Sequence, residues 1–439
     1  MHLNLFAYAC GHHGAAWRAP GSAVDRLGDI AFYEELARIA ERGRLDAIFF
    51  ADGQSLAVPM LADGPMWFLE PLTVLAALAR ATERIGLVTT VSSTFHTPYH
   101  AARMLASLDH ISGGRIGWNV VTSMSDDEAR NHGMAALPPH SARYARAAEF
   151  IDAVLALWDS WPAESLEHDR AGSYARPSLV RPIDHVGEHF AVRGPLNVPR
   201  PPQGHPVLFQ AGASEQGRAL AGARAEAIYA VAYDLPAAQA YRADVRARVA
   251  AAGRDPDSVA VLPGLVTYVG GTVAEARAQQ ARLDALLPAE SSLRQLSRYV
   301  GQDCSRWDLD GPVPSLPPLA AFTGPQGRYA TVLRIVAQER PTVRQLLGRL
   351  AAGGGHATMV GTPEVIADEI ERWLDEGGAD GFNLMPPTLP GGARDFVEQV
   401  VPELQRRGRF RREYAGSTLR SHLGLAVPVL EPAGGPMLR

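Results

Sequence analysis

The chain has 439 residues and a formal net charge of −5, with 46% hydrophobic and 20% charged residues. This composition is that of an ordinary globular protein, and the negative charge argues against a nucleic-acid partner. Its two cysteines, Cys10 and Cys304, cannot build a disulfide framework, and no apolar run approaches the ~20 residues that span a bilayer. The N-terminus also lacks the charged start and apolar core of a signal peptide, so we expect a soluble, cytoplasmic protein without a membrane partner.

Short apolar runs, typical of buried strands, alternate with amphipathic helical patterns along most of the chain. The predicted strands cover residues 3–8, 47–51, 85–91, 115–121, 207–210, 227–232, 259–269 and 381–385. The predicted helices cover residues 30–42, 70–80, 98–112, 126–130, 141–158, 236–251, 272–287, 342–350, 361–378 and 393–407, and a further helix follows the turn 211–214. Eight strands separated mostly by helices predict an α/β fold, a (β/α)8 TIM barrel with insertions, and a doubly wound sheet is the alternative.

Residues 85–123 show the repeating unit most clearly, as a strand, a helix and a second strand. Thr97 can cap the helix, and Pro98 can be its first residue, where a missing N–H costs nothing. Gly113 and Gly114 end the helix. A unit this short predicts a parallel pair of strands with a crossover helix.

Three stretches depart from the alternation. Residues 159–206 are rich in Pro, His and Arg, which predicts an irregular excursion with a hairpin. The pattern lapses over residues 288–341, a segment too long and too Pro-rich for a routine connection, which predicts a functional lid insertion. Residues 408–439 form a C-terminal arm, and we expect the whole chain, 1–439, to be a single barrel domain with these additions.

The run SLDHISGGRIGWNVVTS, at residues 107–123, resembles the signature of one family. It is similar to the nitrilotriacetate-monooxygenase branch of the bacterial-luciferase-like flavin monooxygenases. The C-terminal sequences DGFNL, VVPELQRRGRFRREY and TLRSHLGL resemble the same family. The resemblance implies a two-component FMN-dependent monooxygenase with a luciferase-like barrel. A separate NAD(P)H:flavin reductase would supply reduced FMN, which reacts with O2 to a C4a-(hydro)peroxyflavin that oxygenates a small organic substrate. We expect the protein to assemble as a homodimer or homotetramer.

Five residues are candidates for binding FMN, and each also has an ordinary structural reading. Asp52 ends a strand and could simply start a turn, and Thr90 is a good strand residue near the rim. His140 and Tyr144 are spaced i, i+4 and can project from one helix face, and Ser214 stands at a helix N-terminus that could bind phosphate. The resemblance implies that Asp52 and Thr90 lie beside the flavin, His140 and Tyr144 hold its polar tail, and Ser214 contacts its phosphate. Arg143, on the same helical turn as Tyr144, could add positive charge there.

His12 and His13 are the candidate catalytic residues, in the loop that closes the first strand. A hydroxylating flavin enzyme must move one proton, and histidine suits that task near neutral pH. Resembling enzymes place histidines in this loop before a Trp-Arg pair, matched here by Trp17 and Arg18. The alternative is that the two histidines line the pocket.

Other functions remain open from the sequence. A metal-dependent barrel hydrolase could use His12 and His13, but it would need ligands at later strand ends, where Asp380 stands at the wrong end of its strand. His96 and His100 have a zinc-compatible spacing without a supporting acid, so we predict no metal site. A flavin-binding protein without catalysis and a deazaflavin-dependent enzyme are further alternatives.

Overall fold

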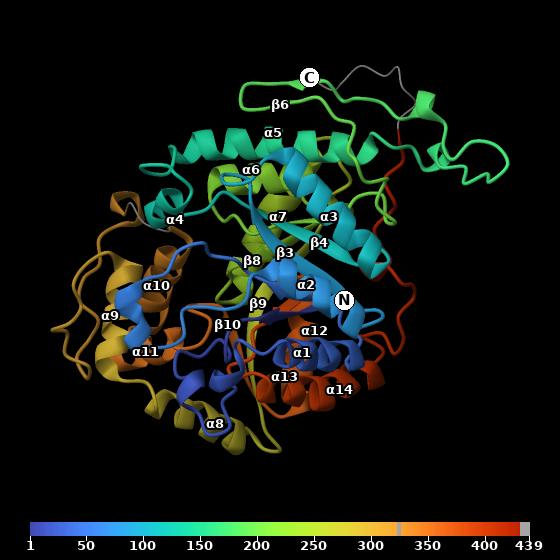
Figure 1. Ribbon diagram of the computed structural model, residues 1–439. Helices are drawn as coiled ribbons and strands as arrows, with labels where there is room; N and C mark the ends of the chain where they lie inside the picture. Colours follow the sequence, from blue (N-terminus) through green and yellow to red (C-terminus); the bar gives the residue numbers. More distant parts are fainter. Residues whose placement is uncertain (323–325, 431–439) are drawn as a thin grey trace.

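The computed structural model describes residues 1–322 and 326–430. Within these residues, eight parallel strands close into a barrel with helices around it (Figure 1). The strand β1 pairs with both β2 and β11, and β8 pairs with β9, so the ring has no open edge. The predicted (β/α)8 barrel is confirmed, because a doubly wound sheet would have left two edges unpaired. The barrel strands are β1 (His2–Ala7), β2 (Ala47–Phe50), β3 (Gly86–Ser92), β4 (Ile116–Val121), β7 (Val207–Gln210), β8 (Ala227–Ala230), β9 (Ala260–Val269) and β11 (Gly381–Leu384).

Where bounds were predicted, the helices between the strands begin and end within three residues of them. Thr362 caps its helix by accepting a hydrogen bond from the Val365 N–H. Thr97 is different, because it stands at the N-cap position without a side-chain hydrogen bond. These helices are α1 (Ile30–Arg42), α2 (Pro71–Ala81), α3 (Pro98–Ser112), α4 (Asp126–Asn131), α5 (His140–Asp159), α6 (Glu215–Arg224), α7 (Leu235–Ala251), α8 (Val273–Ala285) and α12 (Pro363–Asp375).

The sequence reading missed one strand. β10 (Ala357–Gly361) pairs with the second half of β9, beyond the point where β9 leaves β11. β9 can do this because it is ten residues long, whereas β8 and β11 have four each. The short run ATMVG directly follows three glycines and a histidine, and it is a strand because it pairs with β9.

The predicted final helix, 393–407, has a break in its hydrogen-bonding pattern. It is divided into α13 (Gly391–Asp395), a π-helical turn at Phe396–Val400, and α14 (Val401–Arg406). Pro402 has no N–H to donate to the preceding turn, which explains why regular α-helical bonding is interrupted there.

The insertion after α8 contains more helix than the sequence indicates. Two helices, α9 (Ala289–Val300) and α10 (Gln326–Glu339), account for about half of the stretch 288–341, where the alternating pattern lapses in the sequence, and α11 (Val343–Leu350) follows. They pack around their own apolar cluster, which includes Leu296, Tyr329 and Leu346. Residues 323–325 of the predicted insertion lie outside the described residues.

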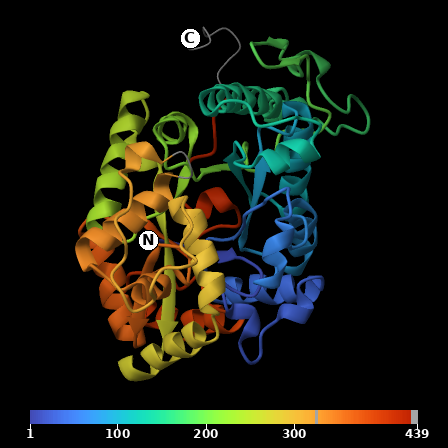
Figure 2. The ribbon, with the colours of Figure 1, turned by 90° about the vertical axis from the view of Figure 1, so that its left-hand side faces the viewer.

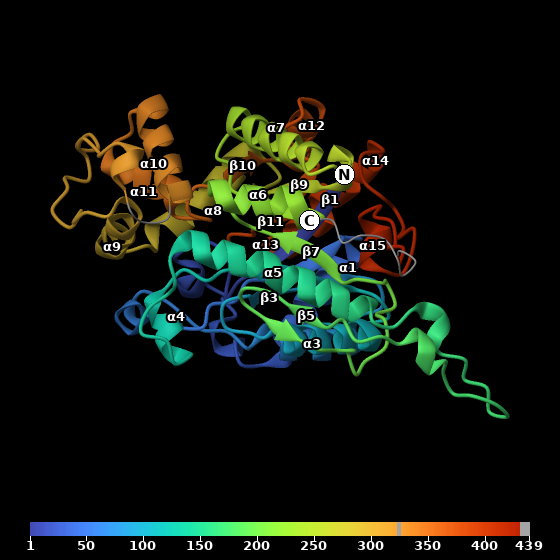
Figure 3. The ribbon, with the colours of Figure 1, turned by 90° about the horizontal axis from the view of Figure 1, so that it is seen from above.

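The predicted hairpin in the excursion 159–206 is confirmed as β5 (His185–Val186) paired with β6 (Ala191–Val192). The excursion and the helices α9 to α11 lie on opposite sides of the barrel in Figures 1 and 3. Figure 2 looks onto the side where α9, α10 and α11 gather. The excursion and the insertion therefore extend opposite sides of the molecule.

The far end of the barrel is filled by the C-terminal arm. α15 (Leu419–His422) inserts Leu419 among the strands, so that a Cβ on Gly86 would lie 2.5 Å from a Leu419 methyl group. Arg420 is almost fully buried and pairs with Glu226 at 2.6 Å. Figure 3 shows α15 away from α9 to α11, and the buried Leu419 side chain packs against Gly86 and Gly117 at this end of the barrel. Residues 431–439 of the predicted arm lie outside the described residues.

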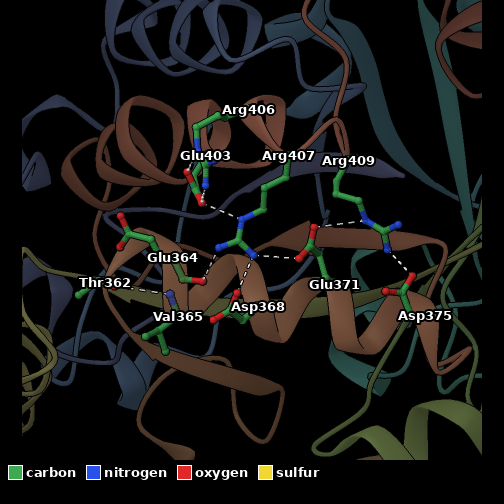
Figure 4. A network of polar contacts seen from close by, with 10 residues as sticks. All are labelled: Thr362, Glu364, Val365, Asp368, Glu371, Asp375, Glu403, Arg406, Arg407 and Arg409. Carbon is green, nitrogen blue, oxygen red and sulfur yellow. Dashed lines mark hydrogen bonds and ion pairs between the residues drawn. The ribbon is translucent and has the colours of Figure 1, made fainter.

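Several of the arginines at residues 406–412, around the start of the C-terminal arm, form ion pairs within the chain. Arg407 pairs with Glu403, Asp368 and Glu371, and so fastens the end of α14 onto α12 (Figure 4). Arg406 also pairs with Glu403, at 2.7 Å. These charges are therefore paired within the chain.

Within the residues described, none of the helices combines the length and the apolar character that crossing a bilayer requires.

Candidate active site

The candidate residues lie at the end of the barrel where the strands finish. Because the barrel strands are all parallel, their carboxyl ends open onto one mouth, and such mouths carry function in barrels of this kind. Asp52 follows β2, Thr90 is near the end of β3, and Ser214 follows β7. His140 and Tyr144 come from the first turns of α5.

A cradle for an anion forms between the turn after β7 and the N-terminus of α6. Gly212 and Gly217 pack face to face, so that a Cβ on Gly217 would lie only 2.8 Å from the Gly212 Cα. The hydroxyl oxygen of Tyr144 lies 3.0 Å from that same position. Ser214 caps α6, its hydroxyl oxygen accepting a 3.1 Å hydrogen bond from the Gly217 N–H. The N-terminus of α6, with the Ser214 hydroxyl at its cap and the Tyr144 hydroxyl beside Gly217, suits a phosphate.

His140 and Tyr144 share one face of α5, as predicted, with ring centroids 4.8 Å apart. Arg143 turns to the loop after β4, where it donates to the carbonyls of Thr122, at 3.2 Å, and Ser123. Its guanidinium fastens α5 to this loop, and among the described residues it has no hydrogen bond to the cradle.

The acid in the first turn of α6 is neutralised. Glu215 would repel a phosphate there, but Arg248 binds both of its carboxylate oxygens, at 2.9 and 3.0 Å. Arg218 approaches Glu215 at 3.2 Å and also donates to the Ala213 carbonyl at 3.1 Å. The charge around the cradle therefore does not oppose an anion.

A second group of polar side chains lies across the mouth, at the ends of β2, β3 and β4. The buried hydroxyl of Thr90 donates to the Phe50 carbonyl and accepts from the Asn119 amide, both at 2.9 Å. Asn119 Oδ1 is buried and has no hydrogen-bond partner among the described residues. An unsatisfied buried acceptor is costly, so this atom fits a site that receives an N–H group from a ligand. From the sequence alone, Asn119 reads as a packing and backbone-positioning residue of its strand.

Asp52 is half-buried just beyond β2. Burial raises the pKa of its carboxyl, although a 3.1 Å hydrogen bond from the Gln54 side chain opposes the rise. Glu128 accepts hydrogen bonds from the backbone N–H groups of Gln54 and Ser125, both at 3.1 Å. The loops after β2 and β4 are therefore tied together beside Asp52.

His12 stands at the mouth with one nitrogen already engaged. Its Nε2 lies 3.0 Å from the Phe6 carbonyl, which can only accept, so Nε2 carries the proton and Nδ1 has the lone pair. The ring stacks on Tyr8 at 5.5 Å. Burial lowers the pKa of His12 to about 4, and the positive charge of Arg328 contributes to the decrease. His12 is therefore a neutral proton acceptor at pH 7.

His13 is engaged at both nitrogens. Its Nδ1 accepts from the Ala15 N–H, and its Nε2 donates to Asp284 of α8, each at 3.0 Å. The side chain is buried between the first loop and α8. The geometry therefore separates the two histidines, since only His12 keeps an unengaged nitrogen.

His356 and Tyr229 form a hydrogen-bonded pair that the sequence does not identify. His356 precedes β10 and is fully enclosed, with its Nε2 2.9 Å from the hydroxyl of Tyr229 on β8. Burial lowers the pKa of His356 to about 3, helped by Arg328 and His12. The glycines at 353–355 were a signal of close backbone approach here, but glycine-rich turns alone do not point to a neighbour on another strand.

Among residues 1–322 and 326–430, no group of three or more His, Cys, Asp or Glu side chains is arranged to hold a metal ion. The alternative of a metal-dependent hydrolase therefore has no ligand set in this part of the chain.

The comparisons with known proteins agree with this geometry. The luciferase-like monooxygenase family matches residues 5–381. Nitrilotriacetate monooxygenase component A of Aminobacter aminovorans is 46% identical over 443 aligned residues, which cover 98% of this chain and 97% of the relative. The chain belongs to the luciferase-like monooxygenase family. It is a flavin-dependent monooxygenase, since relatives this similar over nearly the whole length carry that activity.

Similar solved structures extend the comparison. EDTA monooxygenase from Chelativorans sp. BNC1 superposes with a TM-score of 0.83 at 37% identity, covering 97% of this chain and 98% of its own. A riboflavin lyase solved with modified FMN and riboflavin superposes with a TM-score of 0.86 at 32% identity, covering 98% of this chain and 97% of its own.

Proposed function

We propose that this luciferase-like monooxygenase uses FMN, in its reduced form, and O2 to oxygenate a small organic substrate. The observation that carries the proposal is the cradle where Tyr144, Gly212, Ser214 and Gly217 meet at the N-terminus of α6. A phosphate is the group that such a helix terminus binds best, and FMN carries one where riboflavin has none. The relative solved with modified FMN adds support.

In this proposal the cofactor lies across the mouth. Ser214 and Tyr144 hold its phosphate, His140 contacts the tail, and Asp52 and Thr90 lie beside the ring. Asn119 Oδ1, which lacks a partner among the described residues, accepts from a ring N–H. Reduced FMN supplies the reaction with O2 and the transfer of one oxygen atom, and the peroxide step expected from the sequence belongs to this proposal.

His12 handles the proton. Its Nδ1 is the acceptor because Nε2–H is held by the Phe6 carbonyl, and the imidazole is neutral at pH 7. His13, first considered with it, is proposed to position the loop by its bonds to Ala15 and Asp284. A neutral imidazole in this place takes up a proton when one must leave the substrate and returns it to solvent.

The proposal also covers the reductase partner, the lid, the cellular location and the oligomeric state. A separate NAD(P)H:flavin reductase supplies the reduced cofactor, as the name "component A" implies for the relative. The insertion 288–341 acts as a lid that keeps water from the mouth. The protein works in the cytoplasm, as a homodimer or homotetramer of one-domain subunits.

The test combines flavin binding with oxygen incorporation. FMN, riboflavin and the deazaflavin are titrated by fluorescence, and substrates are then screened with chemically reduced FMN and ¹⁸O2, without any reductase. We expect FMN to bind at least tenfold more tightly than riboflavin, Tyr144→Phe to remove most of that difference, and one ¹⁸O atom to enter a product. Equal affinity for FMN and riboflavin would contradict the cradle. Tight FMN binding without labelled product from any substrate would favour a flavin-binding protein without catalysis.

A further inference from the structure

A tyrosine and an arginine from the insertion form a pair at the mouth. Arg328, on α10, donates a 2.8 Å hydrogen bond from Nη1 to the hydroxyl oxygen of Tyr299 on α9. Its guanidinium carbon also lies 5.2 Å from the centre of the Tyr299 ring. The two helices thus present one cation and one phenol together.

This pair lies against the turn that holds His12. A Cβ on Gly354 would overlap the Arg328 guanidinium and would lie 2.8 Å from the Tyr299 hydroxyl. The adjoining Gly353 N–H donates to the His12 carbonyl at 3.0 Å. Gly327, next to Arg328, has Ala213 as its nearest neighbour, 3.4 Å from where its Cβ would be. The pair therefore stands between the His12 loop and the turn that leads to Ser214.

The hydrogen-bonding capacity of the pair is not used up within the described chain. Tyr299 accepts from both Gln295, at 3.0 Å, and Arg328, so its own O–H proton is still available to a ligand. Arg328 is exposed and has no carboxylate partner among residues 1–322 and 326–430. Other arginines of α10 and α11 do have one, since Arg334 pairs with Asp234 and Arg349 with Glu339.

The charge of Arg328 acts on the interior of the mouth. Besides burial, which is the main cause, it helps to lower the pKa of both His12 and His356. It also counteracts the rise that burial imposes on the pKa of Tyr8. A cation felt by three side chains around the mouth attracts an anion to that place.

We propose that Arg328 and Tyr299 bind a carboxylate of the substrate, so that this enzyme oxygenates an organic acid. The inference rests on the proposed function, since it assigns the substrate class of the same mouth. A guanidinium binds a carboxylate through two parallel N–H bonds, and the Tyr299 hydroxyl can add a third. The carboxylate would be held beside His12, so that the carbon skeleton extends into the barrel mouth towards the flavin.

The experiment compares carboxylic acids with their methyl esters, which have the same skeleton without the charge. Dissociation constants for a panel of such pairs are measured by calorimetry, with and without saturating FMN. We expect at least one acid to bind at least tenfold more tightly than its ester. Arg328→Gln should weaken that acid about 10- to 100-fold and leave the ester within twofold, as expected for a lost charged hydrogen bond. Tyr299→Phe should weaken the acid by a smaller factor.

The matched control is Arg306→Gln, which removes an exposed positive charge from the same insertion, one that acts on Asp303. It should leave acid and ester binding unchanged. Equal losses for acid and ester in Arg328→Gln, or no acid preference in the natural protein, would overturn the inference. So would an Arg328→Gln protein that loses affinity for FMN but not for riboflavin, because Arg328 would then bind the cofactor phosphate. If the natural protein fails to bind FMN at all, the proposed function fails, and the flavin-free arm still tests Arg328.

Discussion

The hydroxyl oxygen of Tyr144 lies 3.0 Å from the position that a Cβ atom on Gly217 would take, although the two residues belong to different helices, α5 and α6. The space between them is closed on its other side by Gly212. A single methyl group added at Gly217 would therefore disturb the proposed phosphate cradle without touching the barrel strands.

Gly217→Ala should weaken FMN binding about tenfold or more. The new methyl group meets Gly212 backbone atoms at 2.8 and 3.0 Å, so the turn must shift away from the helix N-terminus. Riboflavin affinity should change little, and fluorescence titration of both flavins measures the difference. Gly28→Ala is the control, because its Cβ would meet only Trp67 at an ordinary 3.7 Å. An FMN affinity equal to that of the control would contradict the proposed cradle.

Ser214→Ala should have two effects that can be separated. Loss of the N-cap hydrogen bond to Gly217 costs about 1 kcal/mol of unfolding free energy, measured by urea denaturation. Loss of a phosphate contact should also weaken FMN about tenfold. Thr362→Ala removes the corresponding cap on α12 and should reproduce only the first effect. If both variants bind FMN alike, Ser214 is a cap and nothing more.

Substitutions of His12 and His13 should have different effects, one on the oxygenation rate and the other on the unfolding free energy. His12→Gln is expected to lower the oxygenation rate about 10²- to 10⁴-fold and to change the pH profile, since it removes the proton acceptor. His13→Asn should instead lower the unfolding free energy by about 1 to 3 kcal/mol, because it leaves Ala15 and Asp284 without their partner. Unchanged turnover and pH profile in His12→Gln, with intact FMN binding, would remove His12 from the mechanism.

Stability should fall as the pH is lowered from 6.5. Burial lowers the pKa of His356 to about 3, whereas in the unfolded chain a histidine titrates near its ordinary value of about 6.5. Between these values only the unfolded state takes up the proton, so this histidine costs at most about 2 kcal/mol between pH 6.5 and pH 5. Burial raises the pKa of Asp109 to about 6. The folded state therefore binds this proton more readily than the unfolded chain, so Asp109 adds stability as the pH falls and offsets part of the loss. Urea unfolding at pH 7 and pH 5 should show a smaller acid loss in His356→Gln, and an equal loss would contradict the assignment.

Leu419→Ala should destabilise the protein by about 2 to 5 kcal/mol while leaving flavin affinity unchanged. Leu419 is fully buried where it fills the closed end of the barrel, so its truncation leaves a cavity among β3 and β4. Leu61→Ala, at a side chain that is 43% exposed, is the control and should cost little. An equal effect of the two substitutions on urea unfolding would show that the arm does not seal the barrel.

The barrel could be predicted from the sequence because its signals are local. Alternation of apolar strands with amphipathic helices is written in the chain itself, and Pro363 and Thr362 mark a helix start without help from distant residues. β10 was missed because its strand character comes from pairing with the long β9, which no local pattern reveals. The helices α9 and α10 were missed because the intervening prolines, such as Pro317, dominate the composition of the insertion.

The candidate site could be predicted only in part, because it depends on contacts between residues that are far apart in the chain. Tyr144 and Ser214 could be named because a family pattern surrounds each one, but their meeting at Gly212 and Gly217 depends on how α5 lies beside α6. The difference between His12 and His13 depends on Asp284, which is 271 positions away from His13 in the chain. Arg328 and Tyr299 lie in the stretch with the weakest pattern, so only the folded arrangement brings them to the mouth.

The pairing of β1 with β11 has a consequence for how the protein is made. β1 leaves the ribosome long before its partner residues, Gly381–Leu384, which lie more than 370 positions later in the chain. Until then the nascent chain must carry an unclosed sheet with an exposed strand edge, a state prone to aggregation. Slow synthesis or premature termination in the last part of the message should therefore yield insoluble product, even though the residues around the mouth have nearly all been made.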